Sequence, residues 1–317
     1  MPVSDTVFMF SGQGSQYFQM GKALYDSNAT FHEWMVRLDD VARPLVGGSV
    51  IETLYSGTNA KGDRFDRTLL THPAIFMVEY SLAQTLMRAG VRPTMVLGAS
   101  MGSFAAAAVA GMLEPEDALV AVIRQAVSLE EHSEPGGMTA ILTEPALFRE
   151  DFLHRHSELA AVNFDSHFIV AARKTELDQI EAVLKGRGIV YQRLPVAFPF
   201  HSRWIDQAKS SFGVAMRATR AKLGQLPMIC ADRTTALSEL PSDYFWDVVR
   251  NPIRFREAAI RLDQEGARRF IDVGPAGTLA TFLKYSLPQT TRSTVRSILT
   301  PFGGDQKNLA NLLADGH

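Results

Sequence analysis

The hydrophobic and polar positions of the chain form short apolar runs that alternate with longer segments of helical spacing. The apolar runs cover residues 6–10, 95–97 and 269–273, and each leads into a turn that contains glycine. The helical segments cover residues 17–24, 73–89, 103–110 and 115–129, the second of which has a proline near its start. This alternation predicts a mostly parallel sheet with helices on its faces.

The middle of the chain has a different pattern. Short strands are predicted at residues 139–142, 168–172 and 190–194, with helices at 145–154 and 175–185 between them. Short elements in this order are typical of a ferredoxin-like unit inserted into a larger domain. We therefore predict an α/β protein whose large subdomain comprises residues 1–136 and 203–317 and whose small subdomain comprises residues 137–202.

One of the apolar runs leads into candidate chemistry. It continues as Gly98-Ala99-Ser100-Met101-Gly102, and an alanine-rich helical stretch follows. This is the strand, sharp turn and helix of a nucleophile elbow, whose strained centre requires small neighbours. The hydroxyl stands beside a helix N-terminus, where backbone N–H groups can stabilise an oxyanion. We predict that Ser100 is a nucleophile; a plain glycine-rich turn between strand and helix is the alternative.

A serine nucleophile needs a base. Most of the eight histidines lie in charged, polar or loop segments, which leaves His72 and His201. His201 ends an apolar segment at the return from the insertion, and sites often form at such junctions. An ordinary α/β-hydrolase triad would place its histidine near the C-terminus, where this chain offers only its last residue. We therefore predict a Ser100–His201 dyad, with the imidazole oriented by a backbone carbonyl.

Composition narrows the setting. The chain has 317 residues, is 46% hydrophobic and carries a formal net charge of −2, so it has no global basic field for nucleic acid. Cys230 is the only cysteine, which excludes an internal disulfide and favours a reducing compartment. No run approaches the roughly 20 apolar residues of a membrane span, and residues 7–10 are too short for a signal-peptide core. We expect a cytoplasmic monomer that binds no metal, since the histidines are scattered.

Seven segments together resemble the malonyl-CoA:ACP transacylase family and the acyltransferase domains of polyketide and fatty-acid synthases. In chain order they are FSGQGSQ (10–16), THPAIF (71–76), GASMG (98–102), FHS (200–202), NPIRF (251–255), DVGP (272–275) and PFGGD (301–305). The resemblance covers nearly the whole chain. It implies an α/β-hydrolase-like large subdomain with a ferredoxin-like small one.

The resemblance also assigns roles. Ser100 becomes the acylated nucleophile and His201 the base, then the acid for the leaving thiol. The backbone N–H groups of Gln13 and Met101 form the oxyanion hole, and the carbonyl of Asn251 orients the histidine. No bound cofactor is implied, because the acyl group arrives on the phosphopantetheine arm of an acyl carrier protein.

One departure from the family pattern bears on the substrate. Family members that load malonyl units have an arginine 25 residues beyond the serine, and here that position is Gln125. The arginine pairs with the malonyl carboxylate, and a neutral amide cannot replace it. We therefore expect malonyl to be a poor substrate and a neutral acyl group to be a better one.

Three further positions concern the pocket. Ala99 stands where most relatives have histidine, which removes a side chain from the rim of the elbow. His72 stands where many have glutamine, and it either lines the pocket or simply packs. Phe198 and Phe200 are predicted to shape the acyl channel, with ordinary core packing as the alternative.

Glutamine in place of that arginine resembles the stand-alone acyl hydrolases of polyketide assembly lines that lack built-in acyltransferases. Those enzymes remove stalled acyl groups from acyl carrier proteins. Hydrolysis is thus the first interpretation, transfer of an acyl group between carriers or from coenzyme A the second, and an inactive scaffold that binds carriers the third. A basic cluster is a candidate for docking an acidic carrier, unless nearby acids neutralise it; it comprises Arg250, Arg254, Arg256, Arg261, Arg268 and Arg269.

Overall fold

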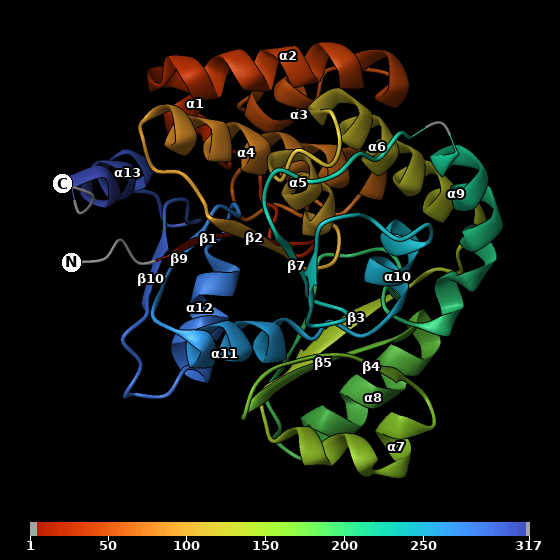
Figure 1. Cartoon of the computed structure of the whole chain (residues 1–317). Helices are drawn as coiled ribbons and strands as arrows, with labels where there is room; N and C mark the ends of the chain where they lie inside the picture. The colour runs from red at the N-terminus through yellow and green to blue at the C-terminus, as the bar shows by residue number, and fades with distance from the viewer. Residues whose placement is uncertain (1–4, 218, 315–317) are drawn as a thin grey trace.

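The computed structural model describes residues 5–217 and 219–314. Two sheets organise this part of the chain: one of six strands at the centre and one of four strands at the edge (Figure 1). None of the helices described is long and apolar enough to cross a membrane.

The large sheet has the strand order β10-β9-β1-β2-β7-β8. Every pair in it is parallel except β7 with β8. Its strands are β1 (Asp5–Phe10), β2 (Met95–Gly98), β7 (Met228–Cys230), β8 (Ala236–Leu237), β9 (Arg268–Asp272) and β10 (Thr294–Ser297).

Helices cover both faces of this sheet, and successive side chains of each strand point to opposite faces. Phe8 and Phe10 enter the core under α2, α4, α5 and α6, whereas Val7 and Met9 enter the core under α11 and α12 (Figure 1). The helices packed around the large sheet are α1 (Lys22–Ser27), α2 (Ala29–Val46), α3 (Val50–Tyr55), α4 (Thr68–Arg88), α5 (Gly102–Val109), α6 (Pro115–His132), α9 (Lys209–Met216), α10 (Tyr244–Arg250), α11 (Phe255–Glu265), α12 (Thr278–Ser286) and α13 (Asp305–Ala314).

The small sheet is antiparallel, with the order β4-β5-β3-β6. Its strands are β3 (Gly136–Ile141), β4 (Glu158–Phe164), β5 (His167–Arg173) and β6 (Tyr191–Arg193). The helical pieces beside it are η1 (Pro145–Arg149), α7 (Asp151–His154) and α8 (Lys174–Gly186); η2 (Arg203–Ala208) follows. The resulting β-α-β-β-α-β order is that of a ferredoxin-like unit, so the predicted fold class is confirmed.

Several predicted boundaries are wrong. The helix expected at 17–24 begins only at Lys22, because Gln19 and Gly21 have positive φ and form turns. The helix expected at 73–89 begins at Thr68, with Pro73 inside it. The helix expected at 145–154 is a 3₁₀ turn followed by the single turn α7.

The hydrophobic pattern did not predict four of the strands. β4 lies between two small-subdomain elements, and β7, β8 and β10 have two to four residues each, too few for a periodicity to appear. β3 begins one residue before the predicted boundary at 137. The division into subdomains at 136/137 and 202/203 stays a prediction.

The topology brings three loops to one edge of the large sheet. β1 pairs in parallel with both β2 and β9, with Phe10 opposite Gly98 and Met9 opposite Asp272. The segments that follow these strands therefore leave the sheet side by side. They are residues 11–16, the elbow at 99–101 and residues 273–277.

Candidate active site

The turn after β2 has the strained geometry of a nucleophile elbow. Ser100 has a φ of 54°, a left-handed conformation that costs a residue with a side chain on the order of 1 kcal/mol. The residues two positions before and after it must be glycine: a Cβ on Gly98 would lie 2.5 Å from the Cα of Ser103, and a Cβ on Gly102 would overlap the backbone of Phe10 and Ser11. Gly102 therefore lets the turn pack directly on the end of β1, and Gly98 lets it pack against the first turn of α5.

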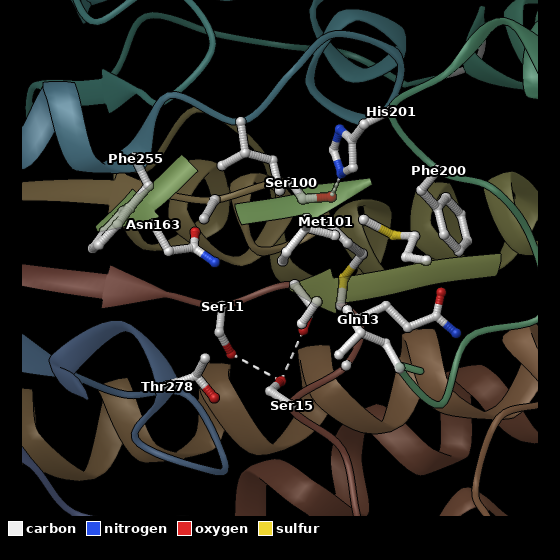
Figure 2. A pocket seen from close by; sticks show the side chains of 18 of the residues that line it. Ser11, Gln13, Ser15, Ser100, Met101, Asn163, Phe200, His201, Phe255 and Thr278 are labelled. Atoms are coloured by element: carbon white, nitrogen blue, oxygen red, sulfur yellow. Dashed lines mark hydrogen bonds between the residues drawn. The ribbon is translucent and has the colours of Figure 1, made fainter. Parts of the chain in front are cut away.

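Ser100 and His201 meet although 101 residues separate them. The Ser100 Oγ lies 2.8 Å from His201 Nε2 (Figure 2). On the other side of the ring, His201 Nδ1 donates to the carbonyl of Asn251 at 2.7 Å. This second bond places the proton on Nδ1, so Nε2 is free to accept the serine proton. Geometrically, this is a nucleophile, a base and a group that orients the base.

The environment of His201 keeps its imidazole neutral. The side chain is 2% exposed. Burial and, to a smaller extent, nearby Arg250 together lower the pKa of His201 to about 4, against the opposing effect of the Asn251 carbonyl. A neutral imidazole at physiological pH is the form that can act as a base.

Two backbone N–H groups are available beside the serine. Those of Gln13 and Met101 donate no hydrogen bond to any residue described in the structure. Met101 directly precedes helix α5, so its N–H lies at the positive end of a helix dipole. Gly12 lies close enough to Ser100 that a Cβ there would be 3.0 Å from the serine Cβ. These positions are those expected of an oxyanion hole.

His72 holds the side chain of Gln13. His72 Nε2 donates to Gln13 Oε1 at 3.0 Å, and Gln13 Nε2 donates to Thr71 Oγ1 at 3.0 Å. Burial lowers the pKa of His72 to about 3, so the ring is neutral. His72 also lines the cavity described next, with its ring 5.7 Å from that of Phe200. It therefore both lines the pocket and positions the loop that carries Gln13.

A cavity of about 360 Å³ opens beside Ser100 and His201. Apolar side chains of the small sheet and of the segment that follows it form much of its wall, including Met138, Ile169, Leu194 and Phe200. Among the residues described, its wall contains no lysine and no arginine. The cavity therefore offers a bound acyl chain no permanent positive charge.

Sequence reasoning missed part of this wall. Asn163, His167 and Thr278 line the cavity, and Asn163 Nδ2 lies 3.1 Å from His167 Nδ1. The two sit at the turn between β4 and β5, and the undetected strand β4 concealed that they face the site. Figure 2 places Asn163 and Thr278 across the cavity from Gln13 and Phe200.

Two predicted pocket residues do not line this cavity. Phe198 packs edge to face against Phe200, which takes the place in the wall. Gln125, 1% exposed, lies behind the wall on α6, where its Nε2 donates to the carbonyl of Phe245 at 3.3 Å and its Oε1 has no partner among the residues described. Phe245 stacks on Phe104 of the helix after the elbow.

The basic cluster is neutralised within the chain. Five of its six arginines form ion pairs with acids, and Arg269 donates instead to the carbonyl of Leu312. The pairs are Arg250 with Asp206 and Glu158, Arg254 with Glu257, Arg256 with Asp165, Arg261 with Glu265, and Arg268 with Asp5 and Glu265. The cluster therefore offers a carrier protein little free positive charge. In the same described ranges, no three His, Cys, Asp or Glu side chains gather as a metal site would require.

The fold and the site define a class: an α/β protein that presents an elbow serine, paired with a histidine, between a parallel sheet and a small antiparallel one. The acyl transferase domain family matches residues 7–314. The polyketide biosynthesis acyltransferase homolog BaeD of Bacillus velezensis is 45% identical over 307 residues, which cover 96% of this chain and 95% of that protein. The homolog PksD of Bacillus subtilis is 40% identical over 304 residues, covering 96% and 94%.

Solved structures agree. A loading acyltransferase from the avermectin modular polyketide synthase superposes with a TM-score of 0.87 at 25% identity, over 98% of this chain and 99% of that one. The chain belongs to the acyltransferase family, and the family expected from the sequence is confirmed.

Proposed function

We propose that the protein hydrolyses neutral acyl groups from acyl carrier proteins of polyketide biosynthesis, through an acyl-enzyme on Ser100. One observation carries the choice of substrate: the cavity beside an intact dyad has no lysine or arginine in its described wall, and position 125 is an uncharged amide. A malonyl carboxylate buried there lacks a cation, which costs several kcal/mol. An acetyl or longer alkyl group carries no such penalty.

The geometry supports a two-step reaction. Ser100 Oγ attacks the thioester carbonyl carbon while His201 Nε2 takes the hydroxyl proton. The oxyanion accepts hydrogen bonds from the N–H groups of Gln13 and Met101. The C–S bond then breaks, and the imidazolium returns its proton to the departing thiolate, which leaves an ester on Ser100.

Water completes the cycle. The neutral His201 takes a proton from a water molecule whose oxygen attacks the ester. When the second tetrahedral intermediate collapses, the proton returns to Ser100 Oγ. The products are a free carboxylic acid and the thiol of the carrier arm.

Transfer to a second thiol is the alternative, and the comparisons favour it in one respect. Both bacterial relatives carry the name acyltransferase homolog. The same acyl-enzyme would then be attacked by a thiol instead of water. None of the site residues described here favours water over a thiol as the acceptor, so an experiment is needed to distinguish the two reactions.

The test uses acyl carrier proteins loaded with acetyl, a longer saturated acyl group or malonyl. Each is incubated with the enzyme, with and without a second, unloaded carrier, and both free acid and newly loaded carrier are quantified by mass spectrometry. We expect free acid without an acceptor, released faster from acetyl than from malonyl carrier.

Two outcomes contradict the proposal. Rapid loading of the second carrier with negligible free acid would identify a transferase. Release from malonyl carrier as fast as from acetyl carrier would refute the argument from the missing cation. The Ser100→Ala variant serves as the blank for spontaneous hydrolysis.

A further inference from the structure

Helix α4 carries a buried acid that the reaction does not use. Glu79 is 0% exposed, and its Oε2 has no hydrogen-bond partner in the part of the chain described. The charged group that acts on it is another acid, Asp272, and no cation among the residues described offsets its charge. An ionised carboxylate buried without a counter-ion is among the most costly groups in a protein.

Hydrogen bonds connect this acid to the loop that contains Gln13. Glu79 Oε1 accepts from the Ser11 backbone N–H at 2.7 Å and lies 2.8 Å from Ser11 Oγ. Ser11 Oγ lies 3.0 Å from Ser15 Oγ, which donates to the carbonyl of Gly12 at 2.8 Å. Figure 2 shows the two serines facing each other at the floor of the site.

The number of protons available for these hydrogen bonds identifies the protonation state of Glu79. The Gly12 carbonyl can only accept, so it takes the single hydroxyl proton of Ser15. The contact between the two hydroxyl oxygens then needs the proton of Ser11. The remaining contact, from Ser11 Oγ to Glu79 Oε1, has a proton only when the carboxyl group itself donates. An ionised Glu79 would leave one of these short oxygen contacts without a proton.

The same loop is anchored to α4 at a second point. His72, one residue after Thr71 and two turns before Glu79, holds the Gln13 side chain. Helix α4 is thus hydrogen-bonded to the loop at Ser11 and at Gln13. Between these two anchors lies Gly12, which packs against Ser100.

We propose that Glu79 is a protonated positioning residue. Its carboxyl group donates to Ser11, Ser11 donates to Ser15 and Ser15 donates to the Gly12 carbonyl. These three consecutive hydrogen bonds fix the loop that presents the Gln13 N–H to the oxyanion. Burial and the nearby Asp272 both raise the pKa of Glu79 well above its usual range, against the hydrogen bond from the Ser11 backbone N–H. Asp272, in the strand next to β1, is the facing acid, and His72 on the same helix face is neutral.

The protonation state has a direct test. Protein labelled with ¹³C at the glutamate carboxyl carbons is titrated by NMR, and the Glu79 signal is identified by its loss in Glu79→Gln. We expect a protonated carboxyl at pH 7. A signal that titrates near the ordinary glutamate pKa of about 4.3 overturns the proposal.

Stability gives a second, independent readout. The unfolded chain releases the Glu79 proton near the ordinary pKa, whereas the folded chain retains it, so folding weakens as pH rises. The folding constant of the wild type relative to Glu79→Gln should fall about tenfold per pH unit above pH 5, until the raised pKa is reached. A ratio that does not change with pH overturns the proposal.

The positioning role is tested by acylation of Ser100 with p-nitrophenyl acetate, a small activated ester. The assay needs no carrier protein, so its result is separate from the success or failure of the proposed hydrolysis. We expect Glu79→Ala and Ser11→Ala each to lower kcat by about 10- to 100-fold with little change in KM. The kcat of the double variant should be no lower than that of either single variant, because both substitutions break the same series of hydrogen bonds.

The matched control is Ser81→Ala, two residues further along α4, where a buried hydroxyl without a partner is removed. It should leave kcat unchanged. Unchanged kcat in Ser11→Ala, or a raised KM with normal kcat, overturns the positioning role even if Glu79→Ala does not fold.

Discussion

Two buried polar regions flank the elbow helix, and they differ in how well their polar atoms are satisfied. At the elbow, Ser100, His201 and the Asn251 carbonyl form consecutive bonds of 2.8 and 2.7 Å. Behind it, Gln125 makes one bond of 3.3 Å and leaves Oε1 without a partner among the residues described. A buried acceptor without a partner costs on the order of 1–3 kcal/mol.

The two regions therefore differ in the part that we assign to them: the elbow to the reaction, and position 125 to the choice of acyl group. The elbow region brings together a nucleophile, a base and a group that orients the base. An apolar side chain at position 125 would avoid the cost of the unpartnered oxygen, so stability alone does not explain the amide. The contrast is the basis of our proposal that the acyl group accepted here differs from malonyl.

The strongest way to break the comparison is to remove the nucleophile. Ser100→Ala should lower turnover by about 10⁴-fold or more, because no acyl-enzyme can form. Free acid released from acetyl carrier measures the rate, and the intact protein mass reports the acyl-enzyme. Ser103→Ala, one helical turn further along and outside the cavity wall, should remain active. Turnover in Ser100→Ala near the wild-type rate would refute the assignment.

The elbow should also be intolerant of small additions. Gly102→Ala places a methyl group into the backbone of Phe10 and Ser11, so we expect destabilisation of about 3 kcal/mol. Urea unfolding monitored by circular dichroism measures it. Gly48→Ala is the control, since a Cβ there meets nothing within 4 Å, and should change stability by less than about 0.5 kcal/mol. Equal effects would show that the elbow is less tightly packed than described.

Restoring a cation sharpens the other half of the comparison. Gln125→Arg should raise the preference for malonyl over acetyl by about 10- to 100-fold, the value of a charge-assisted bond to the carboxylate. Competition between the two loaded carriers measures the ratio. Gln125→Met, of similar size and uncharged, should leave it unchanged. An unchanged ratio in a folded Gln125→Arg protein would mean that position 125 does not contact the acyl group.

The smallest effect concerns pH. His201 must be neutral to accept the serine proton, and burial lowers its pKa to about 4. We therefore expect kcat/KM to hold on acidification until about pH 4, well below the 6.5 of an ordinary histidine. An acidic limb near 6.5 would contradict this environment. The exposed His154 offers a control, since His154→Gln should not move the limb.

The low pKa of His201 also affects stability, with the opposite sign to Glu79. The unfolded histidine takes up its proton near pH 6.5, before the folded one does. Stability is therefore complete above pH 6.5 and falls as pH drops toward about 4. The contribution of His72, whose pKa is about 3, has the same sign.

Local patterns predicted the parts that local physics controls. Alternation of strand and helix indicated the fold class, because burying both faces of a parallel sheet requires it. The glycines around Ser100 predicted the elbow, because a side chain at either position would clash with β1 or with the first turn of α5. Short strands such as β7 and β10 were missed, since their pairing with long strands, and not their own periodicity, makes them strands.

The sequence by itself determined the strained turn at the serine, the strand before it and the absence of a charge at residue 125. Only the tertiary structure decided that His201 reaches Ser100, that Asn251 holds the ring, that Phe198 and Gln125 lie outside the cavity wall, and that Glu79 meets the loop at Ser11. The reason is separation along the chain. Backbone conformation depends on neighbouring residues, whereas these contacts join segments far apart in the chain that only the packing of helices, loops and both sheets brings together.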